Sequence, residues 1–298
     1  MMIDTSVTRP REANFPIVLE REDRVHQPGQ IDIYQGEYVQ ATDPEGDHIV
    51  LGSAVCPSPA LELGPTMAPD GRVAFFSDRE GDWKVYAGKP GQEKPSVLLD
   101  RDDVVDVRFS PDGEQMAFIT AKDGWDMGLW LARPDGSEAR PVPLGKLEPW
   151  EAQYSPDGRS LLFTSFDFNP ETDGLYQLDL NSLKTKQLAQ GDLWTPCLSP
   201  DGKSAAYVEF GSEANTVLRL DLETGQKRAL VEECPGLASS LCFSPDASRL
   251  ILTTMEYERN GLYVIPAQKG GLVELTGRGE VAQVEVCPPR QQPATAVV

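Results

Sequence analysis

The sequence predicts an all-β protein, a six-bladed β-propeller made of four-stranded blades. Three observations support this prediction. A Pro-Asp-Gly turn recurs every 42 to 45 residues, each turn lies between two short apolar segments, and 25 Pro and 26 Gly residues leave little room for long helices. Four strands in a repeat of about 44 residues is the pattern of a propeller blade, whose twisted sheet packs both faces against its neighbours.

The repeated turn sets the register of the blades. Its copies are Ala68–Gly71, Ser110–Gly113, Ser155–Gly158, Ser199–Gly202 and, with alanine in place of the last glycine, Ser244–Ala247. Proline at the second turn position fixes φ, aspartate bonds to its own backbone, and glycine accepts the left-handed conformation. Each copy is therefore expected to join the first and second strands of a blade.

The remaining strands follow each turn in a constant order. Val104–Phe109 is typical of the expected first strands. The second strands are expected at Met116–Thr120, Leu161–Thr164, Ala205–Val208 and Leu250–Thr253. The third strands are expected at Lys84–Tyr86, Gly128–Leu131, Leu175–Leu178, Val217–Leu220 and Leu262–Ile265. A turn containing Gly or Lys and a short fourth strand complete each unit.

Five turns give five blades, and the two ends of the chain are expected to share the sixth. Val284–Pro289 aligns with the strand before the turn, and Tyr38–Leu51 resembles the sequence of a third strand, turn and fourth strand in the other units. The missing second strand is either Ala294–Val298 or Ile31–Gln35, and the sequence leaves this open. Sharing strands in this way removes free sheet edges.

Residues 1–28 lie outside the repeat and are expected to form an N-terminal extension, followed by a single propeller domain over residues 29–298. Within the extension, Pro16–Glu20 is either an extra strand or part of a tail.

Three segments, Phe109–Gly113, Tyr154–Gly158 and Ser77–Tyr86, resemble the repeats of TolB-type six-bladed β-propellers, a WD-like repeat family. The resemblance covers roughly residues 60 to 290 and implies the fold. It does not imply one function, because similar repeats occur in translocation-complex propellers, peptidase propeller domains and oligosaccharide lyases. Periplasmic members of the family carry a signal peptide and a separate N-terminal α/β domain, and neither is visible in this sequence.

The composition excludes several classes of partner. The chain has 47 Asp and Glu against 27 Lys and Arg, a formal charge of -20, which repels nucleic acids and anionic membranes. No stretch is apolar enough to span a membrane, and the N-terminus has no signal-peptide core, so a cytoplasmic protein is expected. Five cysteines without paired spacing are expected to be small buried hydrophobic residues.

Most of the negative charge is expected on one side of the ring. We call this side the top face: it is formed by the loops between second and third strands and by the connections between blades. Asp123 and Asp126 belong to the former loops, and Asp106 and Glu151 follow the latter connections. Lys and Arg are more frequent in the turns between third and fourth strands, so the opposite side is expected to be weakly basic.

Aromatic residues alternate with these acids in the same loops. They are Trp83, Trp125, Trp150, Phe166, Phe168, Trp194, Phe210 and Tyr257. Acids beside exposed aromatic rings suit a basic peptide, a polyamine or a cationic protein surface, through screened attraction and cation-π contacts. The four tryptophans are the expected anchors for a protein or peptide partner. The alternative is that the acids serve solubility and the rings cap the blade core.

The residue five positions before each turn proline is expected to line the mouth of the central channel. These residues are Gly64, Asp106, Glu151, Thr195, Ser240 and Gln283. Asp106 and Glu151 are candidates for sharing a Ca²⁺ ion, which takes several oxygen ligands. The alternative is two carboxylates on the channel wall, bonded to water and backbone. No other cofactor is expected.

Nucleophilic catalysis is not expected. The sequence has no Gly-x-Ser-x-Gly elbow, and its only histidines, His26 and His48, lie in the N-terminal segment away from the expected channel. Two hypotheses follow. The first is a non-enzymatic scaffold that binds a protein or peptide on the top face. The second is a carboxylate-based or metal-dependent enzyme, or a saccharide binder, that uses the channel mouth.

Overall fold

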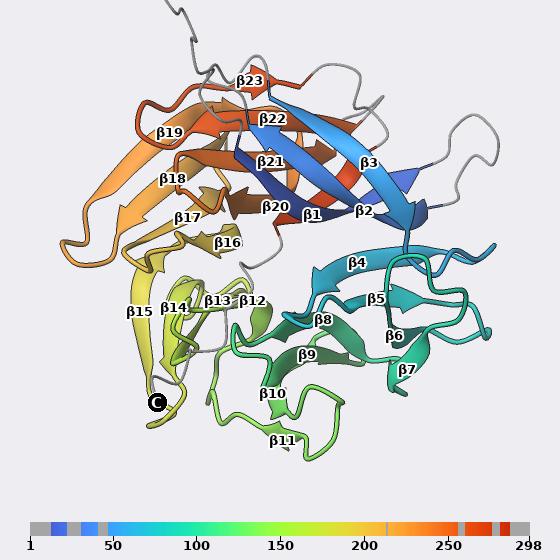
Figure 1. Cartoon of the computed structure of the whole chain (residues 1–298). Helices are drawn as coiled ribbons and strands as arrows, with labels where there is room; N and C mark the ends of the chain where they lie inside the picture. The colour runs from blue at the N-terminus through green and yellow to red at the C-terminus, as the bar shows by residue number, and fades with distance from the viewer. Residues whose placement is uncertain are drawn as a thin grey trace, which may run out of the picture.

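The computed structural model describes residues 13–22, 31–40, 47–212, 214–255, 260–275 and 281–286. Figure 1 shows six sheets arranged in a ring, each of four antiparallel strands. The predicted six-bladed β-propeller is confirmed. The described residues form strands and turns, and none of them belongs to a helix long and apolar enough to cross a membrane.

Each blade runs from an inner strand at the ring axis to an outer strand at the rim. Blade 1 is β4 (Glu62–Met67), β5 (Val73–Ser77), β6 (Lys84–Gly88) and β7 (Ser96–Leu99). Blade 2 is β8 (Val104–Phe109), β9 (Met116–Lys122), β10 (Asp126–Ala132) and β11 (Arg140–Pro141). Blade 3 is β12 (Pro149–Tyr154), β13 (Ser160–Ser165), β14 (Gly174–Asp179) and β15 (Thr185–Gln190).

The last three blades have the same order. Blade 4 is β16 (Leu193–Leu198), β17 (Ser204–Glu209), β18 (Asn215–Asp221) and β19 (Lys227–Cys234). Blade 5 is β20 (Leu237–Phe243), β21 (Arg249–Met255), β22 (Asn260–Pro266) and β23 (Val273–Glu274). Blade 6 is β24 (Val281–Val286), β1 (Ala13–Glu22), β2 (Ile31–Gln40) and β3 (His48–Ala54).

The repeated turns have the hydrogen bonds that their sequence predicts. In blade 3 the Gly158 N–H donates to the Ser155 carbonyl at 2.8 Å, and the Ser155 hydroxyl donates to Asp157 Oδ1 at 2.6 Å. Gly158 has a φ of 69°, the left-handed region that glycine occupies without strain. Ala247 holds the same position in blade 5 with a φ of 58°, where its Cβ is strained.

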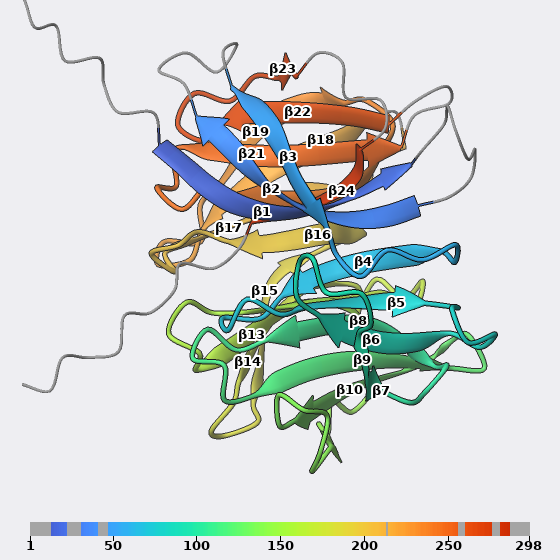
Figure 2. The same ribbon diagram turned by 45° about the vertical axis from the view of Figure 1, so that its right-hand side comes forward.

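Blade 6 is closed by one C-terminal strand and three N-terminal strands (Figure 2). Its second strand is β1, which pairs with β24 on one side and β2 on the other. Pro16–Glu20 is therefore part of this strand. Ile31–Gln35, considered above as the second strand, instead begins the third strand β2. The expected extension over residues 1–28 is too long, because β1 belongs to the propeller. Ala294–Val298 lies outside the described residues.

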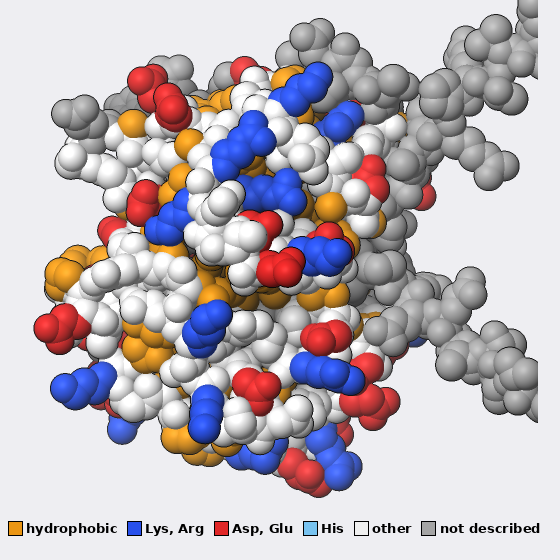
Figure 3. Space-filling view, turned by 90° about the vertical axis from the view of Figure 1, so that its left-hand side faces the viewer, with side chains coloured by type: hydrophobic (Ala, Val, Ile, Leu, Met, Phe, Trp, Pro, Cys, Tyr) orange, Lys and Arg blue, Asp and Glu red, His pale blue; other side chains and the backbone are white. Residues whose placement is uncertain are grey.

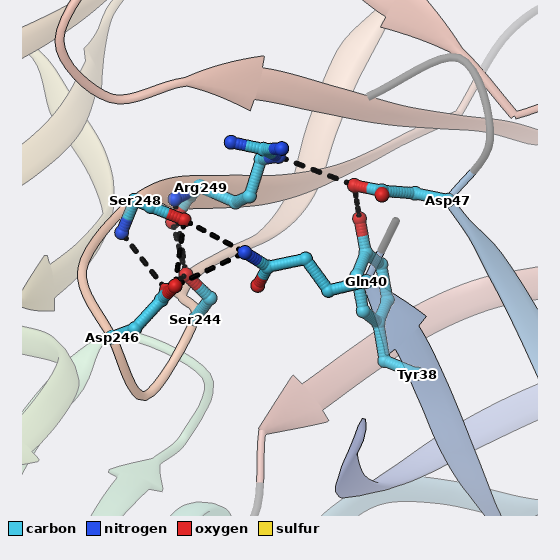
Figure 4. Close-up of polar contacts among 7 residues, drawn as sticks. All are labelled: Tyr38, Gln40, Asp47, Ser244, Asp246, Ser248 and Arg249. Atoms are coloured by element: carbon cyan, nitrogen blue, oxygen red, sulfur yellow. Dashed lines mark hydrogen bonds and ion pairs between the residues drawn. The ribbon is translucent and has the colours of Figure 1, made fainter. Parts of the chain in front are cut away.

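Polar side chains join the N-terminal strands to blade 5 (Figure 4). The Arg249 Nε lies 3.3 Å from Asp47 Oδ2, and this carboxylate also accepts the Tyr38 hydroxyl at 2.7 Å. Gln40 Nε2 donates to Asp246 Oδ2 at 3.0 Å, in the turn of blade 5. Asp47 is fully buried within this group, so the ion pair is shielded from solvent. These contacts fasten the ring where the two chain ends meet.

Apolar side chains fill the spaces between neighbouring blades. Between blades 2 and 3, for example, Ala117 and Ile119 of β9 pack in one cluster with Leu161 and Phe163 of β13. The four described cysteines are buried and free, as predicted: Cys56, Cys197, Cys234 and Cys242.

Candidate functional site

A cavity of about 410 Å³ lies on the ring axis. Its wall is formed by the inner strands of all six blades, β4, β8, β12, β16, β20 and β24. Five of the six residues predicted at the channel mouth do line it: Gly64, Asp106, Glu151, Thr195 and Ser240. The side chain of the sixth, Gln283, lies outside the described residues. The repeat therefore placed the channel wall correctly.

A β-bulge interrupts each blade beside this position. In all six blades the pairing between the inner and second strands shifts by one residue there. Bulges redirect side chains and strengthen the local twist of a strand. In blade 1 the bulge holds Gly64 at a φ of 60°, and in blade 4 it holds Thr195 at 49°. At Asp106, Glu151 and Ser240 the side chain at this position bonds to the inner strand of the next blade.

Asp106 and Glu151 use this direction to link neighbouring blades. Asp106 Oδ2 accepts the backbone N–H of Ala152, on the next inner strand, at 3.0 Å. The Glu151 carboxylate likewise accepts the backbone N–H of Thr195. Both predicted carboxylates thus satisfy backbone donors of the adjacent blade. This agrees with the alternative given above, two carboxylates on the channel wall bonded to backbone, and the sequence did not show that the bonded backbone belongs to the next blade.

Arg108 lies beside the same pair. Its Nη1 is 3.1 Å from Asp106 Oδ1, and its Nε donates to the Ala152 carbonyl at 3.0 Å. Burial raises the pKa of Asp106, although Arg108 opposes the rise. Burial and, second, the charge of Asp106 raise the pKa of Glu151 to about 7. Near neutral pH the pair therefore carries less than its full negative charge.

Two further glutamates, missed from the sequence, link the N-terminal strands to blade 1. Glu20 on β1 accepts the backbone N–H of Gly64, and Glu62 on β4 accepts the backbone N–H of Ile33 on β2. Burial raises the pKa of each carboxyl to about 7. Arg79 pairs with Glu62 and partly offsets its rise. Glu20 was missed because the sequence offered no repeat that would place β1 in the ring.

The candidate calcium pair has few ligands to offer. The described residues include no group of three or more His, Cys, Asp or Glu arranged to hold a metal ion. Asp106 and Glu151 already accept backbone N–H groups, and Arg108 lies against Asp106. Because Ca²⁺ takes six to eight oxygen ligands, further donors would be required, and calcium binding stays a prediction.

Six of the eight predicted aromatic residues come together on the top face. We call this cluster the aromatic ridge: Trp125, Trp150, Phe166, Phe168, Trp194 and Phe210. Consecutive ring centroids along it, from Trp125 through Trp150, Trp194 and Phe166 to Phe168, are 6.3, 5.6, 5.6 and 4.6 Å apart. Phe210 adds to Trp194 at 6.1 Å. Edge-to-face and tilted contacts of this kind stabilise aromatic pairs.

Loops and inner-strand ends of blades 2, 3 and 4 supply the ridge, and hydrogen bonds fix two of its tryptophans. Trp150 Nε1 donates to the Phe166 carbonyl at 2.7 Å, and Trp194 Nε1 donates to the Asp192 carboxylate. Trp150 also lines the central cavity, so the ridge and the channel form one continuous surface. Trp83, 37% exposed, is carried by blade 1 instead. Tyr257 lies outside the described residues.

Exposed charged side chains lie beside the ridge and along the outer strands. Asp123 and Asp126, on either side of Trp125, are both exposed. Lys184, Lys186, Lys227 and Arg228 are exposed near the outer strands β15 and β19. Figure 3 shows Lys and Arg side chains spread over that side of the ring. Acids therefore flank the ridge, whereas acids and bases both lie at the rim.

Comparisons with known proteins support the fold. The chain is 29% identical over 187 residues to "Uncharacterized peptidase YuxL" of Bacillus subtilis, covering 47% of this chain and 28% of that protein. It is 23% identical to "Tol-Pal system protein TolB" of Nitratidesulfovibrio vulgaris over 47% of this chain and 31% of that protein. The chain thus spans about a third or less of these two relatives. No protein-family model matches it.

A solved structure covers nearly the whole chain. TolB from Acinetobacter baumannii superposes with a TM-score of 0.74 at 23% identity, over 92% of this chain and 67% of the other. The resemblance to TolB-type propellers read from the repeats is therefore confirmed at the level of the fold. At this identity the likeness carries the architecture and not the binding partner.

Proposed function

We propose that this propeller is a non-enzymatic scaffold that binds a protein partner on its top face. One observation carries the proposal. Six aromatic side chains from three separate blades converge into a single ridge, and exposed acids flank it. Aromatic residues are enriched at the centres of protein interfaces, and a charged surround attracts a partner of opposite charge.

The comparisons favour this proposal without naming a partner. One relative is, by its name, a protein of the Tol-Pal system, which is consistent with a propeller that works among other proteins. The peptidase relative matches over only 28% of its own length. A partner with a basic surface best suits a chain whose net charge is -20.

The structure divides the candidate residues into two groups. Trp125, Trp150 and Trp194 belong to the ridge and remain the proposed anchors, with Asp123 and Asp126 as flanking charges. Three others stand apart. Asp106 and Glu151 are bonded between blades, and Trp83 lies on blade 1. A test of binding must therefore spare Asp106 and Glu151, because changing them disturbs the ring.

The experiment is an affinity capture with purified protein as bait, comparing wild type with Asp123→Asn/Asp126→Asn and with Trp125→Ala. We expect one protein partner to be recovered at about 50 mM salt, and recovery to fall at about 500 mM salt, where charges are screened over a few ångströms. Both variants are expected to recover less partner. Equal recovery by wild type and both variants would contradict the proposal.

A second candidate function uses the cavity, whose volume of about 410 Å³ is that of a small-ligand site. In this case the protein would bind a saccharide in the cavity, or would catalyse a metal-assisted reaction at Asp106 and Glu151. Metal analysis of the purified protein is the simplest test. A stoichiometric ion in the wild-type protein would favour this function over the scaffold.

A further inference from the structure

Backbone strain is concentrated at the aromatic ridge. Seven non-glycine residues are recorded at positive φ in the described part of the chain, and three belong to the ridge or its loops: Asp123, Phe168 and Thr195, at 49°, 62° and 49°. Phenylalanine and the β-branched threonine are rarely found in this region. Strain of this kind persists where the surrounding structure enforces it, and it is common at binding sites.

The loop that carries Phe168 is held in place by its own polar side chains. The Asp167 N–H donates to the buried Asp173 carboxylate at 2.8 Å. Asp167 Oδ1 in turn accepts the Asn169 N–H at 3.1 Å and the Thr172 hydroxyl at 2.8 Å. The loop therefore presents Phe168 to solvent on a fixed backbone, and a partner would bind without first ordering it.

Exposure along the ridge is highest at its two ends. Trp125 is 68% exposed and Phe168 is 73% exposed, whereas Trp150, Trp194 and Phe166 between them are partly buried. The rings at the two ends are thus the most exposed, and the three rings between them are more enclosed. This arrangement suits a single large apolar side chain of a partner, packed on the three central rings between the two exposed ones.

The charges beside the ridge indicate which residues of the partner should lie next to its apolar side chain. Asp123, Asp126, Asp167 and Glu171 are exposed, and none of them forms an ion pair with another described residue. A second copy of this chain suits the ridge poorly if it docks through its own ridge, because the same acids of the two copies would then face and repel each other. A neutral saccharide could stack on the rings but would leave the acids unused. Lys or Arg beside the apolar anchor would use both features.

We infer that the aromatic ridge is a seat for a peptide segment of the partner in which a large apolar residue is flanked by Lys or Arg. The segment lies across blades 2 to 4, between Trp125 and Phe168. This inference rests on the proposed function and adds to it the chemistry of the partner and the place where it docks.

The experiment selects peptides from a random library displayed on phage against the wild-type protein. Enriched sequences are then synthesised, and their affinities are measured by fluorescence anisotropy. We expect a large apolar residue next to Lys or Arg in these sequences. Trp125→Ala and Phe168→Asn are each expected to weaken binding by about tenfold or more, as for central interface anchors. Trp83→Ala, which removes an exposed tryptophan from blade 1, is the matched control and should leave the affinity within about twofold.

Phe168→Asn also separates binding from folding. Asparagine tolerates left-handed φ far better than phenylalanine, so the variant should unfold at the same temperature as wild type or higher. Loss of binding with unchanged or raised thermal stability supports the inference. Enriched peptides that lack basic residues, or that bind Phe168→Asn and Trp125→Ala as tightly as wild type, overturn it. So does failure to enrich any peptide. In each case partner capture by the wild-type protein would leave the proposed function standing.

Discussion

Glu20→Gln should make the protein more stable at pH 8 and have a much smaller effect, below about 1 kcal/mol, at pH 5. The Glu20 carboxyl is only 6% exposed and accepts the Gly64 N–H at the seam between blades 6 and 1. Its pKa in the folded protein is raised from 4.5 to about 7, mainly by burial. Glutamine keeps an oxygen that can accept the same N–H and removes the charge.

The size and sign of the effect follow from proton linkage. A folded pKa above the unfolded value means that the folded state binds the proton more tightly. Its contribution is therefore complete below about pH 4.5 and is lost as pH rises through about 7. A rise of this size corresponds to about 3 kcal/mol, at about 1.4 kcal/mol for each pKa unit. We therefore expect the free energy of unfolding of Glu20→Gln to exceed that of wild type by about 2 to 3 kcal/mol at pH 8.

The assay is urea unfolding of both proteins at pH 5, 6, 7 and 8, with the difference in unfolding free energy plotted against pH. Glu37→Gln is the control, because Glu37 lies on the neighbouring strand β2 with an exposed side chain. Its difference from wild type should be small at every pH. A difference between Glu20→Gln and wild type that is constant from pH 5 to 8 would refute the reasoning.

Three further substitutions test how the ring is built, each measured by urea unfolding at neutral pH. Ala247→Gly should stabilise the protein by about 0.5 to 1 kcal/mol, because it relieves left-handed strain in the blade 5 turn; a loss of stability would show that the strain is negligible. Arg249→Ala should cost about 3 kcal/mol, since it removes a cation paired with the buried Asp47 carboxylate, and a cost below about 1 kcal/mol would show that this ion pair does not stabilise the contact between blades 5 and 6. Asp106→Ala should cost about 2 to 4 kcal/mol, because a backbone N–H and Arg108 lose their buried acceptor. If Asp106→Ala instead unfolds like wild type but no longer captures the partner, Asp106 belongs to the binding surface.

The architecture could be predicted because its signal is local. Each turn combines a proline, an aspartate and a residue at positive φ within four positions, and the period between turns then orders all the strands. The second strand of blade 6 has no such signal. β1 pairs with β24, more than 200 residues away in the chain, and no repeated turn precedes β2. Pairing at that separation depends on ring closure, which no short segment encodes.

The candidate site was predictable in position but not in detail. The repeat places aromatic residues of several blades on one face, and the ridge follows from that placement. The role of Asp106 and Glu151 depends on a bulge in each inner strand, which turns their carboxylates onto the next blade. A bulge is a matter of pairing register, and the side-chain alternation of an isolated strand does not show it. The strained backbone at Phe168 could not be predicted from the sequence either, because it depends on the hydrogen bonds that Asp167 makes in the folded loop.

The acids of this protein act through two different physical effects. Glu20 and Glu62 are enclosed between blades, so pH controls their charge, and added salt reaches them little. Asp123, Asp126 and Glu171 are exposed beside the ridge, where salt screens their charges. Raising the salt concentration at constant pH should therefore weaken partner binding while changing stability little. Raising the pH from 5 to 8 at constant salt should lower stability, because the buried glutamates lose their protons.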